Sequence, residues 1–139
     1  MNRAFAIVVL SAGLLAVAGC AVQGSQFARV YPSPDEAVIY VYRPYSYAGS
    51  LLDPPVTCGT GTARIGPGGY HAFVVPARHV VCTVQGEEAT DEVEIDPQPR
   101  VHYLKEEIGW GLLRGHPHLN PMDADKANVE IQTCCVQQR

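Results

Sequence analysis

The chain has 139 residues, a length that suits one domain, and its formal net charge is −4. This acidic balance leaves no basic surplus to hold a phosphate backbone, which argues against a nucleic-acid-binding protein. A hydrophobic fraction of 47% argues against a disordered tail, and 13 glycines with 11 prolines favour a turn-rich, mainly β chain.

The first twenty residues have the layout of a secretory signal. Arg3 supplies a positive charge, residues 4–18 are mostly apolar, and small residues precede Cys20. The apolar stretch is too short to span a bilayer comfortably. Val17-Ala18-Gly19-Cys20 resembles the lipobox of bacterial lipoproteins. That resemblance implies a signal peptide over 1–19, diacylglycerol on the Cys20 thiol and an acyl chain such as palmitate on the new amine.

An ordinary secretory signal remains the alternative, because Ala16-Val17-Ala18 also fits a cleavage site. Residue 21 is Ala rather than Asp. By resemblance to lipoprotein sorting in Gram-negative cells, this predicts the outer membrane, with the protein facing the periplasm or the cell surface. The protein is then expected to be attached to the membrane through the lipid on Cys20. Residues 20–36 are predicted to be a tether, stiffened by Pro32 and Pro34.

Residues 37–139 are predicted to form the folded domain. Short runs of β-branched and aromatic residues alternate with Gly- and Pro-rich turns, a spacing typical of a β-sandwich. The prediction is a seven-stranded antiparallel β-sandwich, immunoglobulin-like or prealbumin-like, with hairpins at 59–61 and 76–77. The predicted strands cover residues 37–43, 56–58, 62–65, 70–75, 78–84, 90–95 and 101–108.

A short C-terminal helix is predicted over residues 121–132. Asn120 is a suitable N-cap followed by Pro121 at the first helical position, and Asp123 and Asp125 favour the positive end of the helix dipole. Alternation of apolar residues in 129–133 would suit a strand instead.

A series of short motifs resembles a family of small bacterial lipoproteins whose domain has no known function. Tyr40-Val41-Tyr42-Arg43-Pro44 opens the series, which covers roughly residues 37–131. The family implies an extracytoplasmic β-sandwich without established catalytic residues. One departure is Pro76-Ala77, where the family usually has Pro-Gly. The remaining motifs are Arg64-Ile65-Gly66, Gly69-Tyr70, Val75-Pro76-Ala77-Arg78-His79, Val101-His102-Tyr103-Leu104 and Asp125-Lys126-Ala127.

Four cysteines follow Cys20, and in an oxidising compartment disulfides are their expected state. Three pairings are possible. A bridge between the adjacent Cys134 and Cys135 would close a strained ring, so we expect Cys58 or Cys82 to take part in a bridge that ties the tail to the domain or one sheet to the other.

Histidines offer an alternative in which the protein is metal-dependent or an enzyme. His71 and His79 would face each other across the predicted 76–77 hairpin, and His116 and His118 form a compact pair in a predicted loop. No carboxylate flanks them at ligand spacing. The interpretation we favour is structural, with no cofactor, no metal and no catalytic residue.

The candidate interaction residues lie after two strands. Arg43 ends an apolar strand and is expected to be partly buried beside a carboxylate, and Tyr45 and Tyr47 follow in a loop. Trp110 lies between glycines and is expected to fold onto the core. The leading hypothesis is a non-enzymatic envelope binding or accessory module that presents loops 44–56 and 109–119 to a protein or glycan. A structural envelope protein without a specific ligand is a further alternative.

Overall fold

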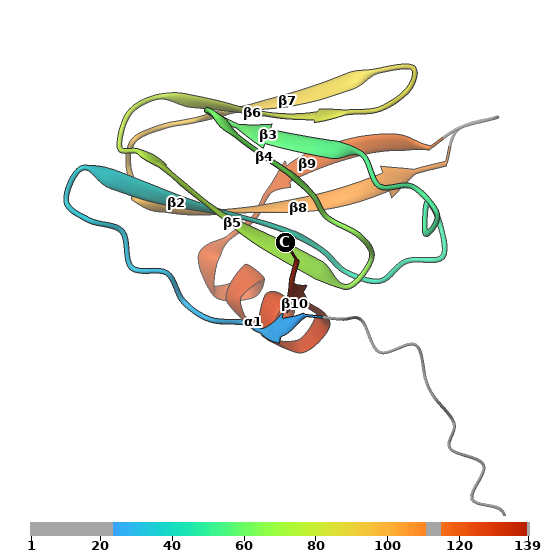
Figure 1. The fold of residues 1–139 in the computed structure, drawn as a ribbon, viewed down its shortest axis with the longest axis horizontal. Coiled ribbons are helices and arrows are strands. Elements are labelled where there is room, and N and C mark those ends of the chain that lie inside the picture. The colour runs from blue at the N-terminus through green and yellow to red at the C-terminus, as the bar shows by residue number, and fades with distance from the viewer. Residues whose placement is uncertain (1–23, 111–114, 139) are drawn as a thin grey trace, which may run out of the picture.

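The computed structural model describes residues 24–110 and 115–138. They form a mainly β structure with two sheets and one short C-terminal helix (Figure 1). The elements are β1 (Ser25–Gln26), β2 (Glu36–Arg43), β3 (Pro55–Cys58), β4 (Gly61–Arg64), β5 (Gly69–Pro76), β6 (Val80–Gln85), β7 (Thr90–Ile95), β8 (Val101–Gly109), β9 (His116–Pro121), α1 (Ala124–Cys134) and β10 (Val136–Gln137).

Three layers are stacked in Figure 1: the four-stranded sheet β4-β3-β6-β7, the six-stranded sheet β1-β10-β5-β2-β8-β9, and α1. Alternation along β2 explains how the larger sheet serves two cores. Ile39 and Val41 pack between the sheets, whereas Tyr40 and Tyr42 pack toward the helix residues Ala127 and Ile131. Because β2 is covered on both faces, it is apolar almost throughout.

The prediction of seven strands, all antiparallel, is wrong both in the number of strands and in their direction. The described residues form ten strands, and two neighbouring pairs, β2 with β8 and β5 with β10, run parallel. The strand β9 contains two prolines and two histidines, which locally resemble a loop, so His116 and His118 lie on a strand rather than in a loop.

The predicted hairpin around Pro76-Ala77 is also wrong. β5 belongs to the larger sheet and β6 to the smaller one, so this turn carries the chain from one sheet to the other. The hairpin at 59–61 is confirmed, because β3 and β4 pair directly across it. The distinction is invisible locally, since both turns join two strand-forming segments.

The helix is confirmed, but it begins later than predicted. Asn120 and Pro121 are the last residues of β9, paired with β8, and Asp123 is the N-cap. The Asp123 carboxylate accepts hydrogen bonds from the amides of Asp125 (3.1 Å) and Lys126 (3.2 Å). No helix of the described residues is long and apolar enough to cross a bilayer.

Residues 24–36, the described part of the predicted tether, lie along the domain. β1 pairs with β10, and Phe27 packs between Tyr40 and Tyr70 with ring centroids 5.3 Å from each. Phe27 is therefore packed on the domain, whereas Tyr31 is exposed. Cys20 and the predicted signal peptide lie outside the described residues.

Two disulfides form, as the oxidising-compartment prediction requires, but their connectivity differs from the prediction. Cys58 and Cys82 are directly paired residues on the neighbouring strands β3 and β6, so their bond lies within one sheet. Cys134 and Cys135, whose bridge was expected to be excluded by strain, are bonded to each other at the end of α1. Helix termination at Cys134 leaves Cys135 in an extended conformation, which places the two cysteines in different backbone geometries.

Candidate functional site

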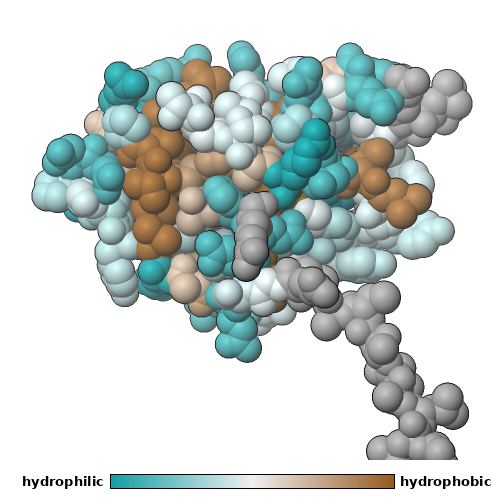
Figure 2. Space-filling view, viewed as in Figure 1, coloured by the Kyte–Doolittle hydropathy of each residue, from teal (hydrophilic) through white to brown (hydrophobic). Residues whose placement is uncertain are grey.

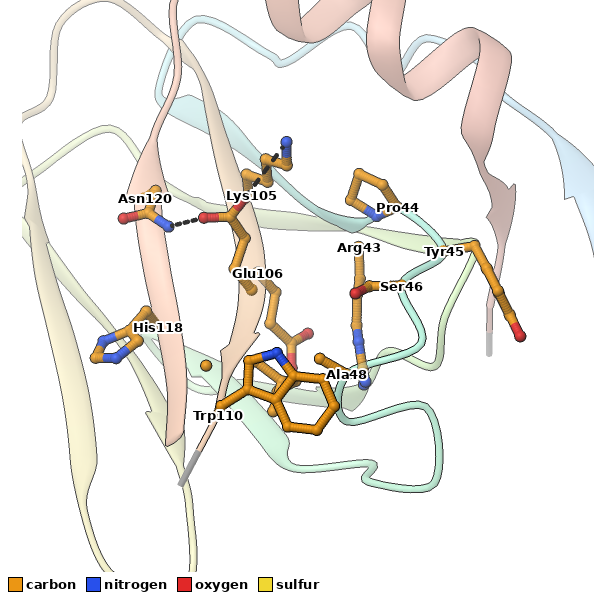
Figure 3. Close-up of a pocket in the computed structure, with 13 residues that line it drawn as sticks. Arg43, Pro44, Tyr45, Ser46, Ala48, Lys105, Glu106, Trp110, His118 and Asn120 are labelled. Carbon is orange, nitrogen blue, oxygen red and sulfur yellow. Dashed lines mark hydrogen bonds and ion pairs between the residues drawn. The ribbon is translucent and has the colours of Figure 1, made fainter. Parts of the chain in front are cut away.

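A pocket of about 550 Å³ opens where β2 and β8 end, beside the β2–β3 loop and the start of the β8–β9 turn (Figure 3). Its volume lies within the roughly 300–1,000 Å³ typical of small-molecule sites. Described residues from both predicted loop regions, 44–56 and 109–119, therefore line the same pocket.

Register explains why two charged side chains lie at the base of this pocket. β2 and β8 run parallel with Tyr42 opposite Lys105, so the next residues, Arg43 and Glu106, continue the face that carries Val41 and Leu104. That face is directed between the sheets. Arg43 and Glu106 are consequently 2% and 1% exposed, although both are ionisable.

The Arg43 guanidinium is fixed by backbone carbonyls. Nη1 donates to the carbonyl oxygens of Leu52 (2.8 Å) and Ile65 (3.2 Å), and Nη2 donates to that of Gly49 (2.6 Å). Gly49 has φ of 69°, and a Cβ atom there would lie 2.5 Å from atoms of Ile108. Only glycine can adopt this backbone conformation so close to Ile108, and the conformation directs the Gly49 carbonyl toward the Arg43 guanidinium. Arg43 thus ties the β2–β3 loop to the sheet.

Glu106 is the unusual member of the site. Neither carboxylate oxygen has a hydrogen-bond partner, although both are buried. Burial raises the pKa of Glu106 to about 8; the nearby charge of Arg43 opposes the shift and that of Asp53 adds to it. Arg43 therefore acts on Glu106 through its charge, and the expected arginine–carboxylate pairing is electrostatic rather than hydrogen-bonded.

A second network lies on the other face of β8 and joins the pocket to the helix. Lys105 Nζ contacts carboxylate oxygens of Glu130 on α1 (2.8 Å) and of Glu107 (3.4 Å). The Tyr42 hydroxyl donates to Glu130 Oε2 (2.6 Å), and Asn120 Nδ2 donates to Glu107 Oε2 (2.9 Å). The hydrogen bond to Glu130 raises the pKa of Lys105, which keeps this lysine charged.

Aromatic side chains form the rim. Tyr45 is 72% and Trp110 79% exposed, and both line the pocket. Tyr47 and Leu51, on the same β2–β3 loop, are 83% and 97% exposed. Figure 2 shows a hydrophobic cluster at this end of the molecule and a larger hydrophobic strip near the opposite end of the same face. The expectation that Trp110 folds onto the core is wrong, because Trp110 directly follows the last residue of β8 and its side chain is exposed.

The four candidate histidines are not brought together. The centroid of the His71 ring lies 4.6 Å from that of the Phe73 ring. His71 does not face His79 across a hairpin, because the chain passes from one sheet to the other at residues 76–77. The other three each lie near a different carboxylate: His79 near Glu94 (3.6 Å), His116 near Glu88 (4.0 Å) and His118 near Asp91 (3.7 Å). Within the described ranges, no three His, Cys, Asp or Glu residues are placed to hold one metal ion.

Glu106 is the functional candidate that sequence reasoning missed. The signal was present in the alternation of 101–108, which places Glu106 on the same face as Leu104 and Ile108. An acidic residue between Leu104 and Ile108 on the inward register of a strand is an expensive choice, and such choices are common at functional sites.

Comparison with protein-family models gave no match, and comparisons with curated proteins and with solved structures also gave none. The resemblance to a lipoprotein family therefore stays a prediction, and the evidence for function lies in the site itself.

Proposed function

We propose that this protein is a lipid-anchored, non-enzymatic binding module of the outer membrane, held by Cys20 and presenting its loop end to a component of the cell envelope. We include in the proposal that its two sheets form a sandwich of the immunoglobulin or prealbumin kind. The anchor rests on the lipobox-like residues 17–20, and the two disulfides suit an oxidising compartment.

One observation carries the binding role: Tyr45 and Trp110 line a polar pocket with exposed rings, and Tyr47 and Leu51 are exposed on the loop that carries Tyr45. Large apolar side chains concentrated at one place on a protein surface mark interaction sites, and tyrosine and tryptophan are enriched in them. The buried bonds of Arg43 hold the loop that carries three of these four residues, so the surface is presented on a fixed support.

The anchor is tested by growing cells with a labelled fatty acid. We expect the wild-type protein to carry the label and the Cys20→Ala variant to lose it, because the thiol is the only group in the lipobox that forms the thioether. A Ser25→Ala variant, which keeps Cys20, serves as the matched control and should be labelled like the wild type. Label that persists on Cys20→Ala would refute the anchor.

The binding role is tested by photo-crosslinking in living cells. A photoreactive residue at Tyr47 should capture an envelope component, whereas the same residue at Glu92, which is exposed on β7 of the other sheet, should not. Mass spectrometry identifies the captured neighbour. Equal capture from both positions, or none from either, would refute a binding surface at the loop end.

A further inference from the structure

The pocket contains a polar group that the fold itself does not satisfy. Glu106 has two carboxylate oxygens without a partner, both buried, and its side chain extends toward the Trp110 side of the pocket (Figure 3). Leaving such a group unpaired is unfavourable. By contrast, Arg43, the other buried charged residue of the described chain, donates to three carbonyls. A bound molecule that supplies hydrogen bonds would recover this cost.

The charges of the lining indicate what kind of molecule this is. Two cationic side chains, Arg43 and Lys105, and two acidic ones, Glu106 and Glu107, line the pocket. Arg43 already donates to three carbonyls and Lys105 is already paired with Glu107 and Glu130, so neither cation is free to pair with an anion. Arg43 also repels a cation placed at Glu106. A neutral ligand that both donates and accepts hydrogen bonds avoids this conflict. Hydroxyl groups have this property, and they suit Glu106 whether it is protonated or ionised.

The rim indicates the shape. Trp110 and Tyr45 line the pocket with exposed aromatic rings, the Tyr45 ring directed outward in Figure 3, and Ser46 and Asn120 are polar members of the same lining. A ring-shaped polyol has an apolar face of C–H groups and an edge of hydroxyls, so it matches a wall of this composition. Glu106 and Trp110 both line the pocket, and the Glu106 oxygens are buried, so a ligand reaches the carboxyl group only when neighbouring side chains move.

We infer that the pocket binds a neutral saccharide, with a pyranose ring against Trp110 and its hydroxyls hydrogen-bonded to Glu106. This inference rests on the proposed binding function and names its ligand class. The bound sugar belongs to a larger envelope glycan. Tyr47 and Leu51 contact the parts of that glycan that lie outside the pocket.

The single tryptophan of the chain gives a direct measurement, because all indole fluorescence comes from Trp110. The full-length protein, in a detergent without a sugar head group, is titrated with the neutral trisaccharides maltotriose, cellotriose and triacetylchitotriose. We expect a saturable change in emission with at least one of them. Deacetylated chitotriose, a cation, and trigalacturonic acid, an anion, should bind at least about tenfold more weakly. No saturable change with any neutral sugar, or tighter binding of a charged one, would overturn the inference.

Two variants locate the binding by calorimetry. Trp110→Ala, at an exposed position that folding does not need, and Glu106→Leu should each weaken binding about tenfold or more. Tyr31→Ala removes an equally exposed ring far along the chain and should bind like the wild type. Wild-type affinity in Trp110→Ala would overturn the inference even if Glu106→Leu fails to fold. If residue 47 captures an envelope component but no saccharide binds, this inference is refuted and the proposed binding function stands. If a saccharide binds but residue 47 captures nothing, the proposed envelope partner is refuted and the saccharide site stands.

Discussion

Replacing Glu106 with glutamine should flatten the pH dependence of stability between about pH 5 and pH 8. Burial raises the pKa of this carboxyl to about 8 in the folded protein, whereas its ordinary pKa is 4.5. Between those values the native state holds a proton that the unfolded state lacks, so the free energy of unfolding falls as the pH rises. The stabilisation that the protonated Glu106 gives the folded state is fully present below about pH 4.5 and is lost by about pH 8. Glutamine cannot ionise and has the same shape.

Urea unfolding at several pH values measures this effect. Over the window the wild type should lose on the order of 3 kcal/mol relative to Glu106→Gln, from a limit of about 1.4 kcal/mol per pH unit for one proton. Arg43 and Asp53 are the charges that act on Glu106, and they are unchanged in the variant. Glu92→Gln, at an exposed site, should keep the wild-type profile. Parallel profiles for the wild type and Glu106→Gln would show that Glu106 is ionised in the folded protein throughout.

Replacing Arg43 with methionine should lower the free energy of unfolding by about 3–5 kcal/mol, a loss typical of breaking a buried charged network. The variant removes the donors to the carbonyls of Gly49, Leu52 and Ile65, and buried acceptors left without a partner are costly. It also removes the cation that opposes the high pKa of Glu106. Denaturant unfolding with the disulfides intact gives the difference.

Two further variants make the Arg43 experiment specific. Arg43→Lys keeps the charge but replaces a planar fork with one nitrogen that cannot reach three separated carbonyls, so it should be intermediate. Arg78→Met changes an exposed arginine and should alter stability by no more than about 0.5 kcal/mol. If Arg43→Met were as mild as Arg78→Met, the arginine would not hold the β2–β3 loop.

Local patterns predicted individual elements well. The hairpin around residues 59–61 has its glycine at positive φ, and the alternation of β7 matches one buried and one exposed face. The faces of α1 were also predictable, because Ala127 and Ile131 recur at helical spacing and are both buried. Each of these features depends on residues close together in the chain.

Features that depend on distant pairing were not predictable. Nothing local shows that β5 and β6 enter different sheets or that β8 lies parallel to β2. The Cys58–Cys82 bond follows from the pairing of β3 with β6. The expectation that strain excludes a Cys134–Cys135 bond is wrong, because the helix ends between the two residues and their backbone conformations differ. Pairing across long loops is set by the packing of the whole core.

The amino-acid sequence alone determined the turn-rich β character, the C-terminal helix and the loops that carry Tyr45, Tyr47 and Trp110. These follow from backbone preferences and from the periodicity of apolar side chains, which neighbouring residues decide. Only the tertiary structure decided that Arg43 and Glu106 meet at the base of one pocket, because their approach requires β2 and β8 to pair in a particular register. The burial that gives Glu106 its high pKa exists only once both sheets have closed over it.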